Sequence, residues 1–282
     1  MAKLFVDNLT VMDFSYLDSD RGVVGESWIV DIELEGELDE QGMVFDFGHV
    51  KKRIKQFIDE QADHRLLVPV DASGCVTHIE DDELSIEFPM NSGDVVRHRS
   101  PAAAVLLLAG TEVDLEAIAR DLQDALLTVL PENVQSVGII LRPETIQGAF
   151  FHYTHGLQQH EGQCQRIAHG HRSRLEIYVD NRRSTELEVS WAERLADSYI
   201  ATEGHVRETF EHNGIEHVKL AYRASHGEFE LSLPRTQVFT MERVSTVENI
   251  AIHLATQVAK DAAGVVRVKA FEGVGKGAFG GV

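Results

Sequence analysis

The segment CQRIAHGH at residues 164–171 places a cysteine five residues before two histidines that a single glycine separates. In a β-strand, residues i and i+2 point to the same side of the sheet. His169 and His171 would therefore present two imidazoles side by side, and the glycine would leave room on the opposite face. Such a pair is either part of a metal site or a polar strand edge, and this segment alone favours the polar edge.

A third histidine and a thiol lie close by in the chain. The preceding segment FFHYTHGL contains His152 and His155, and antiparallel pairing across the loop 158–167 would bring one of them opposite the pair. Three histidines with an open fourth position are the ligand set of a catalytic zinc ion. Cys164 falls in that loop, where a nearby dication would favour its thiolate and suit it to abstract a proton. With these additions, the metal site and the polar edge are about equally supported.

The composition limits the class of partner. Of 282 residues, 46 are acidic and 26 basic, and the net charge is −20 with neutral histidines. This charge disfavours nucleic acid or an anionic membrane as a partner, because both bind cationic surfaces. The apolar run Val105 to Ala109 is too short to span a bilayer, and the N-terminal residues lack the apolar core of a secretory signal. Two cysteines in so long a chain indicate reduced thiols, so we expect a cytoplasmic protein.

Two stretches of the sequence repeat one pattern. SVGIILRPETIQGAF (136–150) and GVVRVKAFEGVGKGAF (264–279) each contain a β-branched strand, a glutamate and then Gly-Ala-Phe. The expected strand GESWIVDIELEG likewise matches GHRSRLEIYVDN. The sequence therefore predicts a tandem duplication of one unit, with domains at 1–147 and 148–282.

The expected elements indicate an α+β fold, in which each domain is an antiparallel four-stranded sheet with two helices on one face. Strands alternate in hydrophobicity, and helical patterns recur at spacings of three and four residues. The helices are expected in DFGHVKKRIKQFIDEQADH, in SWAERLADSYIATEGH, and around Leu115, Ile118, Leu122, Leu126, Val247, Ile250, Leu254 and Val258. An insertion at 206–240, without a recognised counterpart in the first half, follows the helix of the second half.

The motifs together resemble the family of 6-pyruvoyl-tetrahydropterin synthases and 6-carboxytetrahydropterin synthases. The similar pieces are FHYTHGL, CQRIAHGH, GMVFDFGHVKKRIKQFIDEQADHRLL, STVENI and the last strand with its glutamate, which cover most of the chain. The resemblance implies tunnelling-fold domains, a zinc ion and a pterin substrate. It also implies a set of site residues: His155, His169 and His171 as metal ligands; Cys164, Asp63 and His64 in catalysis; Glu272, Thr246 and Glu248 in substrate binding.

These residues are divided between the two copies. The first copy has Tyr16, Val24 and Glu26 where the metal histidines would align, and Glu144 where Glu272 would align, a glutamate more simply explained as a remnant of duplication. The second copy has no convincing Asp-His pair, and TEGH, ending at His205, is the nearest remnant. Complementary retention predicts one composite site, in which the second copy supplies metal and thiol and the first supplies the Asp-His pair.

The resemblance implies a reaction on 7,8-dihydroneopterin triphosphate that forms 6-carboxytetrahydropterin, a step towards queuosine-like deazapurines. The same residues would serve a pyruvoyl-forming synthase or a lyase that cleaves the pterin side chain. A non-catalytic protein that binds a pterin or a metal is the alternative from another class. Because family members close rings from several units, we expect a homo-oligomer, either a trimer of tandem chains or a dimer.

Overall fold

The computed structural model describes residues 2–282, and the chain divides into two compact units. Unit 1 consists of Met1–Met12, Trp28–Asp63 and Val113–Glu144. Unit 2 consists of Asp13–Ser27, His64–Glu112 and Thr145–Val282, and so takes segments from both sequence copies. Among the described residues, no helix is long and apolar enough to cross a membrane.

Unit 1 packs two helices beside a sheet. Helix α2 packs on strand β8, which pairs antiparallel with β2, and α1 contacts α2. Asp46 and Asp114 are the N-caps of the two helices, and their carboxylates accept hydrogen bonds from backbone N–H groups of the first turn. Of the residues predicted on the apolar faces, Ile54, Ile58 and Leu122 are among those that are buried, whereas the side chain of Val50 lies outside the described part of the structure. The bounds are β1 (Ala2–Asp18), β2 (Gly22–Gly36), α1 (Phe47–Gln61), α2 (Leu115–Leu127) and β8 (Val134–Pro143).

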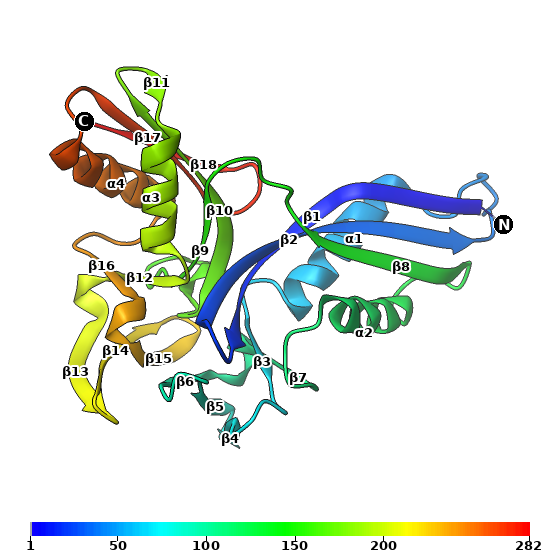
Figure 1. The fold of residues 1–282 in the computed structure, drawn as a ribbon. Coiled ribbons are helices and arrows are strands. Elements are labelled where there is room, and N and C mark those ends of the chain that lie inside the picture. The colour runs from blue at the N-terminus through cyan, green and yellow to red at the C-terminus, as the bar shows by residue number, and fades with distance from the viewer. Residues whose placement is uncertain (1) are drawn as a thin grey trace. The chain divides into compact units, whose positions relative to one another are not determined.

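Unit 2 contains a seven-stranded sheet in the order β16-β12-β9-β10-β17-β18, with β11 also paired to β10. Helices α3 and α4 cover one face of this sheet, and their apolar residues form one core with it (Figure 1). The bounds are β9 (Phe150–His155), β10 (His169–Val179), β11 (Arg182–Arg183), α3 (Thr185–Leu195), β12 (Ser198–Thr202), β16 (Val238–Met241), α4 (Val247–Asp261), β17 (Val266–Phe271) and β18 (Gly277–Gly281).

The insertion at 206–240 has a counterpart in the first copy, which the sequence reading missed. Three strands from each copy form one six-stranded sheet of unit 2 in the order β13-β14-β15-β6-β5-β4. His98 of β6 lies opposite Leu231 of β15 in an antiparallel pair. On either side of them, Arg97 lies opposite Ser232 and Arg99 lies opposite Glu230. The bounds are β4 (Val76–Glu80), β5 (Glu83–Pro89), β6 (Val95–Pro101), β13 (Val206–His212), β14 (Ile215–Ala224) and β15 (Gly227–Pro234).

Parallel strand pairs distinguish the structure from the wholly antiparallel four-stranded layout that we predicted. Strand β3 (Leu66–Pro69) runs parallel to β1 and to β7 (Val105–Leu108), and β12 runs parallel to β9 and β16 in the second copy. The helix expected in SWAERLADSYIATEGH was also misplaced, because α3 starts at Thr185 and Ser198–Thr202 is a strand. Short apolar runs do not reveal by their pattern alone whether they are helix or strand, or which strand they join.

A buried histidine in the six-stranded sheet predicts how folding stability depends on pH. Burial lowers the pKa of His98 to about 3, and its Nε2 is 2.9 Å from Ser100 Oγ. In the unfolded chain this histidine binds a proton near pH 6.5, whereas in the folded protein it does so only near pH 3. The free energy of unfolding therefore keeps the whole contribution of neutral His98 above pH 6.5. It falls between pH 6.5 and pH 3, by at most about 1.4 kcal/mol per pH unit.

We expect His98→Leu, which copies the residue of the equivalent position in β15, to flatten the loss of stability between pH 6.5 and 4. Urea unfolding at a series of pH values measures this slope. The control is His78→Leu, because it removes an exposed histidine from the same sheet. An unchanged slope in His98→Leu would contradict the assignment.

Candidate active site

Three histidines of unit 2 lie on one face of the paired strands β9 and β10. The antiparallel register places His155 directly opposite His169, and His171 follows two residues later on the same face. His152 lies three residues before His155 and therefore points to the other face, where its Nδ1 is 2.7 Å from Gly25 O. All three histidines of the cluster are buried, and their candidate ligand atoms lie within 4.8 Å of one another.

A hydrogen-bond acceptor behind each ring orients it. Nδ1 of His155 donates to Ser245 O at 2.8 Å, and Nδ1 of His169 donates to Arg166 O at 3.0 Å, because a carbonyl oxygen can only accept. Nδ1 of His171 lies 3.2 Å from the Asp13 carboxylate. Because Nδ1 of His155 and of His169 is hydrogen-bonded and Nδ1 of His171 faces a carboxylate, the Nε2 atoms turn towards the centre of the cluster.

The inward nitrogens are arranged as metal ligands. Nε2 of His155 and of His171 are 3.3 Å apart, and the buried Nε2 of His169 has no hydrogen-bond partner in the described part of the chain. Burial, with the neighbouring imidazoles, holds the pKa of His155 and of His169 well below the usual range, which keeps them neutral. Neutral imidazole is the form that binds metal, so the donor set fits a three-nitrogen cation site.

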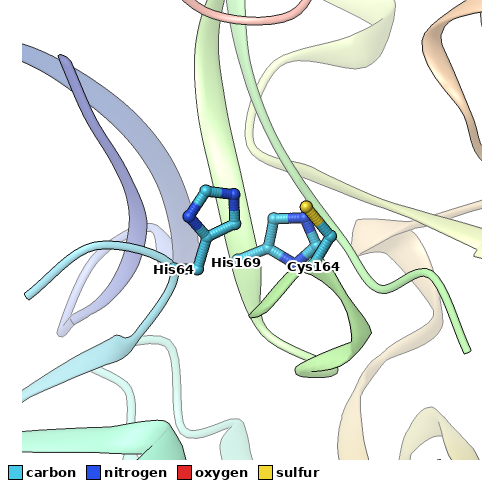
Figure 2. A group of neighbouring side chains, drawn as sticks. All are labelled: His64, Cys164 and His169. Carbon is cyan, nitrogen blue, oxygen red and sulfur yellow. The ribbon is translucent and has the colours of Figure 1, made fainter. Parts of the chain in front are cut away.

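A thiol and a fourth imidazole adjoin this cluster. Figure 2 shows His64 and Cys164 on either side of His169, and ligand atoms of these three residues also lie within 4.8 Å of one another. The rings of His64 and His169 are 5.1 Å apart. Cys164 and His64 are half-buried, whereas the three clustered histidines are buried, so the thiol lies at the more open side of the site. His64 comes from the first sequence copy and the others from the second, within one chain.

Asp13 joins the two parts of the site, and the sequence reading missed it. Its backbone oxygen accepts from His64 N at 2.7 Å, while its side chain faces His171 and accepts from Ser27 Oγ at 2.5 Å. Burial acts to raise the pKa of Asp13, but His171 and Lys276, whose Nζ is 3.1 Å away, lower it below the usual range. A carboxylate within the apolar run VMDF was the available signal, since a buried charge needs a partner.

The remaining predicted site residues lie outside the two groups of candidate metal ligands. Glu272 follows β17, and its carboxylate together with that of Asp13 raises the pKa of Lys276 against the effect of burial. Thr246 caps α4, where its Oγ1 accepts from Asn249 N at 3.4 Å, and Glu248 is exposed in the first turn. Asp63, two residues after the end of α1, belongs to unit 1, as does Glu144. Within STVENI, it is the Ser245 carbonyl that contacts a clustered histidine.

Near the first-copy equivalents of the metal histidines, an ion pair joins the two copies. Arg21 donates to Asp197 through two nitrogens, at 2.9 and 2.5 Å, and to Tyr16 Oη at 2.9 Å. His64 precedes β3, which pairs in parallel with β1, and Asp197 precedes β12, which pairs in the equivalent way with β9. Both residues have a left-handed backbone, with φ values of 55° and 54°. Asp197 is therefore the counterpart of His64, and the earlier alignment with His205 was wrong. Glu26, whose pKa burial raises to about 7, lies 3.8 Å from His152.

The fold and site thus define an α+β protein with a buried three-histidine cluster beside a thiol. A family model described as 6-pyruvoyl tetrahydropterin synthase matches residues 15–146 and again residues 145–279. The chain therefore belongs to this family and carries its domain twice. Members of the family are pterin-processing lyases that are generally metal-dependent and oligomeric.

Individual relatives are more distant. A Pyrococcus horikoshii protein with the name "Putative 6-carboxy-5,6,7,8-tetrahydropterin synthase" is 36% identical over 62 residues, or 22% of this chain and 36% of that protein. A Pyrococcus abyssi protein of the same name is 27% identical over 133 residues, or 47% of this chain and 76% of its own. The match thus spans about a third of the first relative. The crystal structure of Plasmodium vivax 6-pyruvoyl tetrahydropterin synthase aligns with 50% of this chain and 97% of its own at 16% identity, with a TM-score of 0.38.

Metal binding should separate the two histidines that the sequence left as alternatives. We expect one metal ion per chain, and we expect His155→Ala to weaken its binding at least about 100-fold, because loss of a supporting residue alone typically costs 10- to 100-fold. His152→Ala is the matched control and should retain the ion, since His152 lies on the other face. Elemental analysis after gel filtration measures both. Two ions per chain, or loss of metal in His152→Ala, would refute the assignment.

Proposed function

We propose that the protein is a zinc-dependent pterin synthase that converts 7,8-dihydroneopterin triphosphate to 6-carboxytetrahydropterin. The observation that carries this proposal is the cluster of three inward-facing imidazole nitrogens with the Cys164 thiol and the His64 ring at its open side. Family membership supplies the substrate class, and the names of the two archaeal relatives support the carboxy product.

His155, His169 and His171 would hold the zinc ion. A zinc ion so held would act as a Lewis acid towards substrate oxygen and make an adjacent C–H more acidic. The chain supplies orientation, because the Ser245 and Arg166 carbonyls and the Asp13 carboxylate fix the three rings. The buried position of the rings limits the access of water from behind.

Proton movement is assigned to Cys164 and His64. The Cys164 thiol can give up its proton to a nitrogen of the neighbouring His64 ring, and the resulting thiolate can then abstract a proton from substrate carbon. The left-handed backbone of His64, held by hydrogen bonds from His64 N to Asp13 O and from Arg166 Nη1 to His64 O, orients this ring. Asp63, the preceding residue, is the proposed carboxylate partner of His64.

Substrate recognition is assigned to Glu272. Its carboxylate would accept from the amino and ring N–H groups of a pterin, a bidentate arrangement that selects this heterocycle. Thr246 and Glu248, at the start of α4, are proposed to contribute from the segment that directly follows Ser245. We also propose a homo-oligomer built from two or three tandem chains.

The thiol should be needed for chemistry and not for metal retention. We expect Cys164→Ala to reduce turnover about 10²- to 10⁴-fold, the usual contribution of a positioned acid–base group, while zinc content is unchanged. Cys75→Ala is the control, because Cys75 is partly buried against a hydrophobic core and lies outside the cluster of Cys164, His64 and His169.

Mass analysis of products from dihydroneopterin triphosphate identifies the reaction. A carboxylated pterin with acetaldehyde supports the proposal, whereas a pyruvoyl pterin, or glycolaldehyde, would assign one of the related reactions instead. A zinc-loaded wild-type protein without turnover would leave only a binding function.

A site formed within one chain predicts the outcome of mixing variants. Cys164→Ala and His64→Ala each lack one residue of a cluster to which both sequence copies contribute. Because both residues come from the same chain, we expect co-refolded mixtures of the two variants to remain inactive, with a Cys164→Ala/His64→Ala double variant as the reference. Recovery of about a quarter of wild-type activity would show that the site forms between chains.

A further inference from the structure

A buried amide lies next to the thiol. Gln165 follows Cys164 in the short 3₁₀ turn Gln163–Gln165 and is fully buried. Its Oε1 accepts from Ser225 Oγ at 3.0 Å and from His226 N at 2.9 Å. Its Nε2 donates to Gly162 O at 3.0 Å and to His160 O at 3.4 Å. Both donors and both acceptor positions of the amide are thus engaged.

This amide connects two parts of unit 2 that are far apart in the sequence. The groups that accept from Gln165 belong to the loop that carries Cys164, whereas the groups that donate to it belong to the turn between β14 and β15. That turn is part of the six-stranded sheet built from the insertions. A buried amide satisfied in this way strongly restricts its neighbours, because each lost hydrogen bond leaves a buried polar group unpaired.

Tyr222 of β14 makes a second connection to the same loop. Its hydroxyl donates to Gln165 O at 2.9 Å. A Cβ added to Gly156, the residue after His155, would lie only 2.1 Å from this hydroxyl. Tyr222 therefore packs against the chain beside a proposed metal ligand and beside the proposed catalytic thiol. In addition, Leu157 N donates to Cys164 O at 2.9 Å.

The first copy repeats this contact without a thiol. There the β1–β2 turn contains Asp20, whose Oδ1 accepts from Asn91 Nδ2 at 2.8 Å, and Asn91 lies in the turn between β5 and β6. Asn91 N also donates to Ser19 O at 2.7 Å. In both copies, the inserted hairpin therefore contacts the loop that joins the first two strands. The contact is exposed in the first copy and buried in the second.

We propose that Gln165 is a positioning residue, which fixes Cys164 Sγ relative to His64 and His169 by clamping its loop to the β14–β15 turn. The insertion is therefore a support for the reactive thiol. This inference rests on the proposed role of Cys164 in catalysis, but the position of the thiol can be measured without turnover.

The test measures thiol reactivity and turnover on zinc-loaded, full-length protein. In Gln165→Ala, release of the loop should raise the iodoacetamide alkylation rate of half-buried Cys164 at least fivefold at pH 7.5, while kcat falls at least tenfold and KM changes less than about threefold. Peptide mass analysis separates Cys164 from Cys75, which is an internal reference for general loosening. Ser225→Ala should act in the same direction with a smaller effect, and Ser225→Thr, which keeps the hydroxyl, should behave as wild type.

Asn91→Ala is the matched control, because it breaks the equivalent contact of the first copy and should leave Cys164 unchanged. Equal alkylation of Cys164 in wild type, Gln165→Ala and Ser225→Ala would overturn the inference, as would parallel acceleration at Cys75. If Gln165→Ala does not fold, Ser225→Ala decides. If Cys164 is alkylated faster in Gln165→Ala but the wild type does not turn over the pterin, the positioning role is supported and the proposed reaction is rejected. If alkylation is unchanged in the variants but the wild type turns over the pterin, the positioning role is rejected and the proposed reaction stands.

Discussion

Three imidazoles share one small buried volume, and the acceptors behind them decide which nitrogen each ring turns inward. Two backbone carbonyls and one carboxylate hold the Nδ1 atoms, so that Nε2 of His169 is left buried without a partner in the described part of the chain. Such a group costs free energy unless a cation is bound. The β9–β10 register, the turn before α4 and the placement of Asp13 all serve this single requirement.

Duplication explains how Asp13 came to serve a histidine of the other copy. The two copies meet in unit 2 through equivalent residues, as shown by the 2.8 Å contact between the hydroxyls of Ser15 and Thr154. A Cβ on Gly170 would lie 2.5 Å from Gly25 Cα, so only glycine permits this approach. Around that contact the copies have diverged. One has the histidine cluster, and the other has the ion pair between Arg21 and Asp197.

The sequence was informative where chemistry and periodicity coincide. It predicted the duplication, the apolar faces of α1, α2 and α4, and a cluster built on His169 and His171. It left His152 and His155 as alternatives, because the register of a pair depends on the loop that joins the strands. It missed Asp13 and Asp197, since their partners are over 150 residues away in the chain, and it missed that the insertions pair with each other, because strand patterns do not encode partners.

Covalent linkage of the two copies changes what mutation and dilution can do to the protein. Where a catalytic site is built from residues of two separate subunits, one inactive subunit also inactivates the sites that it shares with its neighbours. Dissociation of such a complex removes every catalytic site. Here His64 and the histidine cluster are held at a fixed local concentration by the polypeptide itself. Each chain therefore carries both His64 and the histidine cluster, and the two copies can diverge independently around them.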